Sequence, residues 1–281
     1  FNNNYAISMN SKTFENNELL IDRSADQIKP LFVKSNYPID YLVLEIDGLA
    51  ILKFPLKFCN RLFSTINMGN EYMYTIPWNK FNMDFIPVVS LQLKIIKFII
   101  ISSHLCQAEL YIQSKFINND SKMSLVSENL NLQIRQYQEE NIILNQNDNN
   151  STDLKFKGNI TGIFIDNVNM KEIINFKLKL GNYEKINYNI IQLQVFAKEI
   201  DNNCFYIPFN DLEFSDNLFY NNSENSSIDF SKIKNISIEI KSNIDQDIKI
   251  KTFSHNILKI SNGMLGLENQ SVDQTMINNF K

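Results

Sequence analysis

The sequence has 281 residues, which is long enough for one large domain or two modest ones. Hydrophobic residues make up 44% and aromatic residues 12%, as in globular chains, and only seven glycines and six prolines exclude a collagen-like or low-complexity protein. The formal net charge of −4 argues against a protein that condenses nucleic acid or binds anionic lipid through its charge. Isoleucine and phenylalanine are abundant and alanine is scarce, which favours strands over helices.

The cysteines and the most apolar segment bear on whether the chain has disulfides, a zinc site or a membrane-spanning segment. Cys59, Cys106 and Cys204 lie far apart, without a Cys-x-x-Cys spacing. Such scattered residues favour free thiols in a reducing compartment over a disulfide framework or a zinc site. Residues 95–101 are strongly apolar, but this run is far shorter than the roughly 20 residues that span a bilayer, so we expect a core strand. Residues 1–4 lack the basic start and apolar core of a signal peptide.

Short segments with strand character follow one another through the first half of the chain. Residues 2–17 are polar with scattered aromatic residues and are expected to form an arm or a first edge strand. Asp47-Gly48 has the composition of a tight hairpin turn, and residues 123–129 fit one or two helical turns. Further strands are expected at 31–34, 41–46, 51–63, 72–78, 85–93, 108–117 and 130–138.

The apolar pattern changes phase in the middle of this half. Odd-numbered residues are apolar from Leu91 to Ile95, and even-numbered residues are apolar from Ile96 onwards. Because side chains of a strand alternate between its two faces, this slip predicts a β-bulge near Ile95 and Ile96.

Residues 145–151, Asn-Gln-Asn-Asp-Asn-Asn-Ser, are predicted to be a linker because they have nothing to bury. It would separate an N-terminal domain, 1–144, from a C-terminal domain with a tail, 152–281. A second series of strands follows it, at 154–165, 176–180, 190–196, 205–209, 228–233, 236–240, 248–251 and 257–260. Two runs of short strands predict two stacked β-barrels or sandwiches.

Glycines and turn residues punctuate the last part of the chain. Gly181-Asn182 ends an alternating strand, and residues 242–245 supply turn chemistry before a returning strand. Gly263 and Gly266 bracket two apolar residues, which predicts a sharp turn or a close backbone approach.

No catalytic constellation is found in the sequence. It contains no glycine-rich phosphate loop and no Gly-x-Ser-x-Gly elbow. His104 and His255 are isolated, and Glu139-Glu140 and Asp245/Asp247 fit solvated charges better than acid–base pairs or calcium ligands. A further set of aromatic residues is expected to belong to the core and not to a stacking platform: Tyr72, Tyr74, Trp78, Phe81 and Phe85. We therefore assign no catalytic, cofactor-binding or metal-binding residues.

Two motifs near the end of the chain carry a family resemblance. Residues 229–233, Asp-Phe-Ser-Lys-Ile, and residues 256–267, Asn-Ile-Leu-Lys-Ile-Ser-Asn-Gly-Met-Leu-Gly-Leu, resemble the end of double jelly-roll major capsid proteins of the nucleocytoplasmic large DNA viruses. Residues 86–117 also resemble that family. Residues 118–122, Asn-Asn-Asp-Ser-Lys, depart from it, because an arginine-rich segment usually stands there.

The resemblance implies an all-β chain of two consecutive eight-stranded antiparallel jelly-roll barrels. It further implies a structural virion protein, without enzymatic activity or cofactors, whose trimers are pseudo-hexagonal capsomers of an icosahedral capsid. The implied partners are further copies of the chain, neighbouring capsomers, minor capsid proteins and inner membrane proteins, with no direct contact to nucleic acid. The implied location is the virion capsid, assembled in the host cytoplasm.

Two alternatives remain open from the sequence. The short chain and the missing arginine-rich segment also fit a divergent minor capsid or scaffold-like double jelly-roll protein. From another class, a jelly-roll carbohydrate-binding module requires exposed aromatic residues beside Asn or Asp on one sheet face.

Overall fold

A computed structural model describes residues 6–63, 72–92, 94–209, 227–261 and 263–268. The chain forms two compact units: unit 1 comprises residues 1–136 and 256–281, and unit 2 comprises residues 137–255. The boundary therefore falls inside two long strands, β9 (Leu130–Leu144) and β19 (Gln246–Ser261), each of which contributes to both units.

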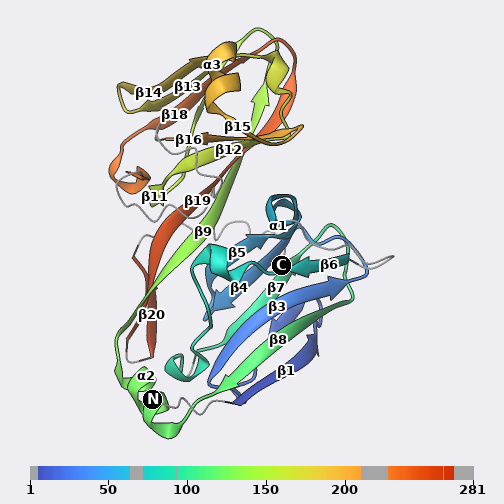
Figure 1. Ribbon diagram of the computed structural model, residues 1–281, viewed down its shortest axis with the longest axis vertical. Coiled ribbons are helices and arrows are strands. Elements are labelled where there is room, and N and C mark those ends of the chain that lie inside the picture. Colours follow the sequence, from blue (N-terminus) through green and yellow to red (C-terminus); the bar gives the residue numbers. More distant parts are fainter. Residues whose placement is uncertain (1–5, 64–71, 93, 210–226, 262, 269–281) are drawn as a thin grey trace. The chain divides into compact units, whose positions relative to one another are not determined.

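Unit 1 contains two four-stranded antiparallel sheets. Their orders are β1-β8-β3-β6 and β2-β7-β4-β5, and β1, β8 and β3 lie side by side in Figure 1. The first strand thus pairs with the eighth, the second with the seventh, the third with the sixth and the fourth with the fifth. This nested pairing defines an eight-stranded jelly roll. The strands are β1 (Ala6–Thr13), β2 (Glu18–Leu20), β3 (Gln27–Ser35), β4 (Tyr41–Ile46), β5 (Leu49–Pro55), β6 (Tyr72–Thr75), β7 (Ile96–Ile101) and β8 (Ala108–Phe116).

Sequence alternation explains most of these strands. In β8, Leu110 and Ile112 are buried while Glu109, Tyr111 and Gln113 are partly exposed, as expected of a sheet with one buried face. The hairpin between β4 and β5 turns at Asp47 and Gly48, whose φ angles of 54° and 81° are both positive. Two positive φ values are the requirement of a type I′ turn, so the predicted tight turn is confirmed.

Several apolar segments of unit 1 are helical where strands were predicted. Within residues 51–63 the strand β5 ends at Pro55, and α1 (Leu56–Phe63) follows with Leu56 and Cys59 buried on one side. Two short 3₁₀ turns, η1 (Trp78–Phe81) and η2 (Val88–Ser90), replace parts of the predicted strands at 72–78 and 85–93. The helical turns predicted at 123–129 overlap α2 (Asn119–Ser127), which is capped by Asn118, whose side chain accepts a hydrogen bond from Ser121 N at 2.8 Å.

The predicted β-bulge near Ile95 and Ile96 is wrong. The strand β7 begins at Ile96, and Ile95 precedes it with an exposed side chain. Leu91 is buried at the end of η2, in a different element. The slip of apolar phase therefore marks the boundary between two elements and not an irregularity inside one strand.

Unit 2 repeats the nested pairing. One sheet has the order β10-β18-β13-β14, and in the other β16-β12-β19 continues to β9, which also pairs with β19. Unit 2 has eight principal strands: β9, β10, β12, β13, β14, β16, β18 and β19. Among them β9 pairs with β19, β10 with β18, β12 with β16 and β13 with β14, so the first strand again pairs with the last and the pairs are nested. Two jelly rolls in one chain confirm the predicted fold class. The strands are β10 (Asn149–Asp153), β11 (Asn159–Ile160), β12 (Gly162–Asp166), β13 (Ile173–Leu180), β14 (Tyr183–Asn189), β15 (Lys198–Asp201), β16 (Cys204–Pro208), β17 (Ile228–Asp229), β18 (Ile236–Ser242) and β20 (Met264–Leu267), the last of which pairs with β19 in unit 1.

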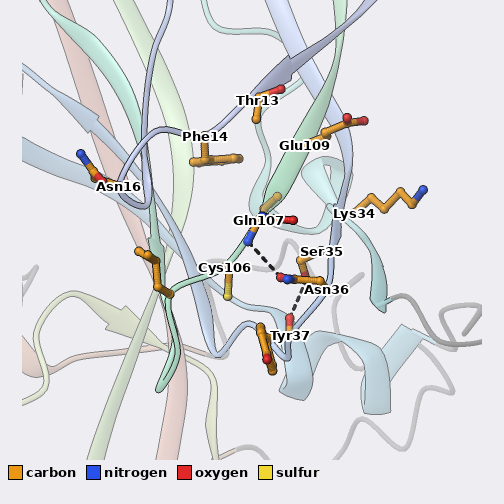
Figure 2. A pocket seen from close by; sticks show the side chains of 12 residues that line it. Thr13, Phe14, Asn16, Lys34, Ser35, Asn36, Tyr37, Cys106, Gln107 and Glu109 are labelled. Atoms are coloured by element: carbon orange, nitrogen blue, oxygen red, sulfur yellow. Dashed lines mark hydrogen bonds between the residues drawn. The ribbon is translucent and has the colours of Figure 1, made fainter.

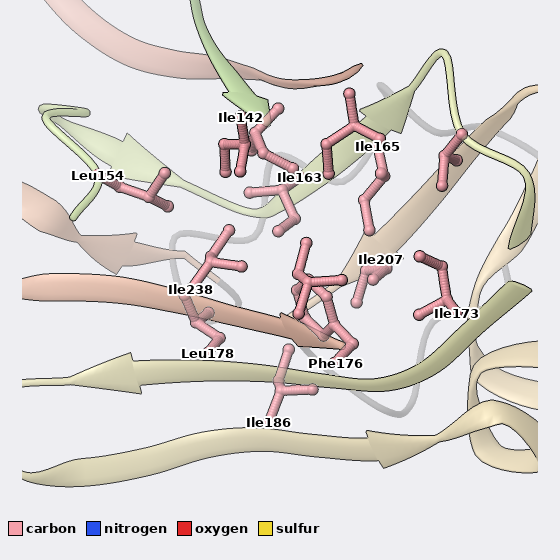
Figure 3. Close-up of a cluster of buried hydrophobic side chains, with 14 of the residues drawn as sticks. Ile142, Leu154, Ile163, Ile165, Ile173, Phe176, Leu178, Ile186, Ile207 and Ile238 are labelled. Carbon is pink, nitrogen blue, oxygen red and sulfur yellow. The ribbon is translucent and has the colours of Figure 1, made fainter. Parts of the chain in front are cut away.

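The core of unit 2 lies between its two sheets. Figure 3 shows Ile163, Ile165 and Ile207 facing Phe176 and Leu178 across this layer. All five side chains are at most 1% exposed. Burying five such side chains stabilises the fold by roughly 1.5–3 kcal/mol each before the entropy of folding is subtracted.

The predicted linker does not lie where the two compact units divide. Residues 145–151 belong to unit 2, where 145–148 connect β9 to β10 and 149–151 form the start of β10. Asn147 adopts a positive φ of 60°, and the Asn150 side chain accepts a hydrogen bond from Asn145 N at 3.0 Å and donates one to Asn145 O at 3.1 Å. Short polar side chains that bond to nearby backbone form tight turns, so this polarity reflects a turn and not a flexible spacer.

Further elements of unit 2 differ from the predicted strands. Residues 190–196 form α3 (Ile190–Phe196), which starts with a capping box between Asn189 and Gln192 and buries Leu193. After β17 the 229–233 motif is a 3₁₀ turn, η5 (Phe230–Lys232), instead of a strand, and η3 (Met170–Glu172) precedes β13. The segments 248–251 and 257–260 belong to one continuous strand, β19, which lies in the sheet opposite β18.

Gly263 and Gly162 each have a structural reason to be glycine. Gly263 has a φ of +73° in the turn from β19 to β20, and the predicted turn at this glycine is confirmed. A Cβ on Gly162 would lie 2.6 Å from the carbonyl oxygen of Ile207, in the paired strand β16, and would also collide with Tyr206. Gly266 has open space around the position of a Cβ.

We expect Gly162→Ala to lower the free energy of unfolding by about 1–3 kcal/mol, because the added methyl group must push two paired strands apart. Thermal and urea denaturation would measure the loss. Gly266→Ala is the matched control and should change stability by less than about 0.5 kcal/mol. Equal stabilities of the two variants would contradict the close approach of β12 to β16.

One buried ion pair lies inside unit 2. Lys251 of β19 pairs with Asp166 of β12, and the two side chains are 8% and 7% exposed. Removal of one member leaves a buried charge without its partner, which is far more costly than removal of both.

Asp166→Asn should therefore destabilise the protein by about 3 kcal/mol, and a double replacement, Asp166→Leu with Lys251→Met, should cost less. Glu239→Gln is the control, because Glu239 pairs with Lys179 at a partly exposed site where a pair contributes at most about 1 kcal/mol. Chemical denaturation of the three variants would be compared. A double variant less stable than Asp166→Asn would contradict the expected cost of removing only one member of this pair.

Candidate assembly surface

One face of the sheet β1-β8-β3-β6 is turned away from the core of unit 1, and we call it the outer face. The register places Ile7 opposite Lys115 and Met9 opposite Gln113, and the same face continues to Phe32, which lies opposite Tyr111. The buried residues of β8 alternate with these positions and point to the other side.

Several apolar side chains are exposed on the outer face. Ile7 is 51% exposed and Met9 59% exposed, both on β1. Phe32 and Tyr111 stack with their ring centroids 4.2 Å apart and are only partly buried. Exposed apolar side chains that gather on one face mark surfaces for interaction with other proteins.

Two lysines border this apolar group. The Nζ atoms of Lys29 and Lys115 lie 5.6 and 5.3 Å from the centroid of the Phe85 ring. These are cation–π distances, so the phenylalanine holds both ammonium groups near the face. The outer face thus combines aromatic and aliphatic side chains with positive charge at its border, a composition that can recognise a partner carrying apolar and acidic groups.

The strand β1 also presents an open edge. It pairs with β8 on one side, and among the described residues no strand pairs with its other side. Its eight residues include no proline and one charged residue, Lys12. Natural sheets usually protect such an edge, because its free N–H and C=O groups can accept another strand. The predicted first edge strand is confirmed, and its edge is suited to contact with another chain.

The position of β1 is supported by an ion pair. Lys12 Nζ bonds to the carboxylate of Asp22, which follows β2, and Asp22 also accepts a hydrogen bond from Ser24 N at 3.1 Å. The bond from Lys12, with further bonds from Ser24, lowers the pKa of Asp22 from 3.8 to about 2. Because the carboxyl is largely exposed, solvent reduces the energetic effect of this pair.

This pKa gives a prediction for acid conditions. A pKa that is lower in the folded chain than in the unfolded chain stabilises the fold above about pH 4, and this contribution is lost as the pH falls towards 2. Lys12→Met should raise the pKa of Asp22 part of the way towards 3.8 and weaken that dependence, because the bonds from Ser24 remain. A carboxyl NMR titration of both proteins would measure the two pKa values. An unchanged value in the variant would show that Lys12 does not hold this carboxylate.

The residues considered for chemistry fall into different elements or have structural roles. His104 belongs to unit 1 and His255 to unit 2. Cys59, Cys106 and Cys204 are buried free thiols, as predicted. Glu139 and Glu140 lie in β9 and not in a loop, and Asp245 accepts a hydrogen bond from Gln146 N at 2.7 Å. The described residues include no group of His, Cys, Asp and Glu that could hold a metal ion.

The aromatic residues of the predicted core are mostly buried. Tyr74, Trp78 and Phe81 are at most 3% exposed, and Phe54 packs against Trp78 and Phe81 with ring centroids 5.1 and 4.6 Å apart. Tyr72 and Phe85 keep partial exposure. The three buried rings, Tyr74, Trp78 and Phe81, cannot contribute to a sugar-binding platform on a sheet face. No helix in the described part of the chain is both long and apolar enough to cross a membrane.

Comparison with solved structures finds viral capsid proteins. PBCV-1 VP54, fitted into a reconstruction of the virophage Sputnik, is similar with a TM-score of 0.73 and 12% identity over 95% of this chain and 97% of that chain. A quasi-atomic model of the PBCV-1 virus capsid gives a TM-score of 0.71 with the same identity and coverage. The Faustovirus major capsid protein gives 0.61 with 8% identity over 93% of this chain and 92% of that chain.

At the level of sequence, no protein-family model matches the chain and no curated protein matches it. The likeness is therefore one of structure, and it extends over both units. Together with the nested strand order of each unit, it shows that the chain has the double jelly-roll fold found in viral major capsid proteins.

Proposed function

We propose that this chain is a structural protein of a virion whose copies associate to build a capsid. The observation that carries the proposal is the double jelly roll itself, which matches a capsid protein over nearly the whole of both chains. The outer face and the open edge of β1 support it, because they offer a large, partly apolar contact surface on a rigid sandwich. We propose no enzymatic activity and no cofactor for this role.

The proposed assembly unit is a trimer. Each chain contributes two similar jelly rolls, so that three chains present six similar bodies and fit a pseudo-hexagonal capsomer. Cyclic symmetry repeats the same contact at each interface, which multiplies modest interactions around the ring. The net charge of −4 opposes close packing only weakly. Neighbouring capsomers, minor capsid proteins and inner membrane proteins are the further partners proposed, in a virion assembled in the host cytoplasm.

A second candidate, a minor capsid or scaffold-like protein, shares the fold and differs in copy number and position in the shell. Residues 118–122 keep this candidate open, since α2 stands where an arginine-rich segment was expected from the resemblance. Quantification of the chain against the other proteins of purified virions would separate the two candidates.

We expect multi-angle light scattering of the purified chain to give a mass near that of three chains at high concentration. The double variant Ile7→Lys/Met9→Lys should shift the protein to monomers, because it places two charges on the outer face beside the existing lysines. Met123→Lys is the matched control, since Met123 is 71% exposed on α2, away from β1 in sequence and sheet.

Circular dichroism and melting curves must show that the double variant remains folded. A wild-type chain that stays monomeric at high concentration, with no lattice in electron micrographs, would contradict the proposed assembly. A trimer that persists in the folded double variant would contradict the outer face as the contact surface and would leave the capsid role to be assigned to another face.

A further inference from the structure

A pocket of about 750 Å³ lies at one end of unit 1, where three connecting segments meet (Figure 2). These segments are the turn after β1, the connection from β3 to β4 and the connection from β7 to β8. Volumes of a few hundred to 1,000 Å³ are typical of sites for small molecules.

The inner wall of the pocket is buried and mostly apolar. Phe14, Cys106 and Ala108 line it and are at most 6% exposed. Phe14 N donates to Ala108 O at 3.0 Å, and Cys106 N donates to Asn17 Oδ1 at 3.3 Å. These bonds connect two of the three segments and give the wall a fixed shape.

Amide side chains surround the opening. Asn36 Oδ1 accepts a hydrogen bond from Gln107 N at 2.9 Å, and Gln107 O accepts one from Asn36 N at 3.2 Å. This reciprocal pair holds the third segment in place and leaves Asn36 Nδ2 and the Gln107 side-chain amide without partners among the described residues. The exposed Asn16 side chain, in a turn with a φ of 50°, adds another amide at the opening.

An aromatic ring stands beside these amides. Tyr37 is 45% exposed, and Ser35 Oγ donates to its carbonyl oxygen at 2.6 Å, which fixes the backbone beneath the ring. The Tyr37 ring lies 5.1 Å from the His104 ring at an interplanar angle of 39°. This contact orients the ring, and much of its surface remains open to solvent.

The pocket is lined by one positively and one negatively charged side chain. Lys34 and Glu109 both line it, and they occupy paired positions on β3 and β8. A cation and an anion at neighbouring positions give no net preference for a phosphate or a carboxylate. The pocket therefore favours an uncharged ligand that combines apolar C–H surface with several hydroxyl groups.

We propose that this pocket binds a neutral pyranose sugar at the end of a glycan. One face of the sugar ring, which carries C–H groups, packs on the open side of Tyr37. Hydroxyl groups donate to and accept from the amides of Asn16, Asn36 and Gln107, which offer both donors and acceptors. This binding activity is separate from the building of a shell and is independent of the number of chains in the assembly.

The sugar can come from two sources, the surface of a cell or a glycan attached to another copy of this chain. Both sources present the same chemistry, and they differ in whether a glycosylated copy of the chain competes for the pocket.

The test is saturation-transfer difference NMR of the full chain, produced in bacteria, with methyl pyranosides of mannose, glucose, galactose and N-acetylglucosamine. We expect ring protons of at least one pyranoside to receive saturation. Tyr37→Ala should reduce that signal at least tenfold, whereas Tyr37→Phe should retain it, because stacking needs the ring and not the hydroxyl. Tyr183→Ala is the matched control, since Tyr183 is 69% exposed on β14 in unit 2.

Melting curves will show that Tyr37→Ala is folded, and Gln107→Ala provides a second variant that should weaken the signal without removal of a ring. Chain taken from purified virions, before and after glycosidase treatment, is then added as competitor to place the source of the sugar. Displacement of the pyranoside only by the untreated chain assigns the sugar to a second copy, and no displacement by either assigns it to another surface. Absence of transfer to all four pyranosides, or a signal that persists in Tyr37→Ala, would overturn the proposal.

Discussion

The structure depends on the pairing of the first strand of each jelly roll with the last. In unit 1, β1 (Ala6–Thr13) pairs with β8 (Ala108–Phe116), and the other six strands of the jelly roll lie between them in the sequence. In the second jelly roll, β9 pairs with β19. Closing such long loops costs conformational entropy, while the innermost pairs, β4–β5 and β13–β14, form across two-residue turns. The innermost hairpins can therefore form locally, but both sheets of a sandwich are complete only when the outermost pair forms.

The nested order also explains how the buried residues are arranged. Strands that follow one another in sequence often belong to opposite sheets, as β18 and β19 do, so their inward faces meet across the core. In unit 2 this brings Ile250 of β19 and Ile238 of β18 into one cluster. Lys251 of β19 lies opposite Phe164 of β12, two residues from Asp166, so the two side chains share one face of the sheet and form their buried pair.

Asparagine has a specific role in this framework. Among the described residues, seven that are not glycine adopt a positive φ, and six of these are asparagines: Asn16, Asn17, Asn82, Asn147, Asn167 and Asn235. Asparagine tolerates the left-handed region better than other residues with a side chain. In a chain with seven glycines, these six asparagines therefore supply turns that would otherwise call for glycine.

Alternation predicted the strands that have one buried face, such as β8 and β18, and local turn chemistry predicted the hairpin at Asp47-Gly48. The alternation of apolar and polar residues did not predict the short helices, because a run of only a few apolar residues fits the period of a helix as well as that of a strand. The capping pair Asn189 and Gln192 was a signal for α3 that could have been used. The outer face could not be predicted, since the place of Ile7 and Met9 beside Phe32 and Tyr111 follows from strand register, which one sequence does not contain.

The loop-end pocket and the outer face both follow from the same framework. Rigid sandwiches hold their connecting segments at fixed positions, so that residues far apart in sequence, such as Asn36 and Gln107, form a site of defined shape. The outer face of unit 1 exposes Ile7 and Met9 and carries the contacts proposed between chains. A double jelly roll can thus separate assembly, on sheet faces and edges, from recognition, at loop ends.

Hydrogen–deuterium exchange of the purified chain tests the nested pairing most directly. The account predicts that amides of β8 and of β19 residues 246–255 exchange slowest, because these strands lie between two neighbours in their sheets. The edge strands β1 and β14 should exchange faster. Exchange in β19 as rapid as in β14 would contradict the closure of the second jelly roll by its last strand.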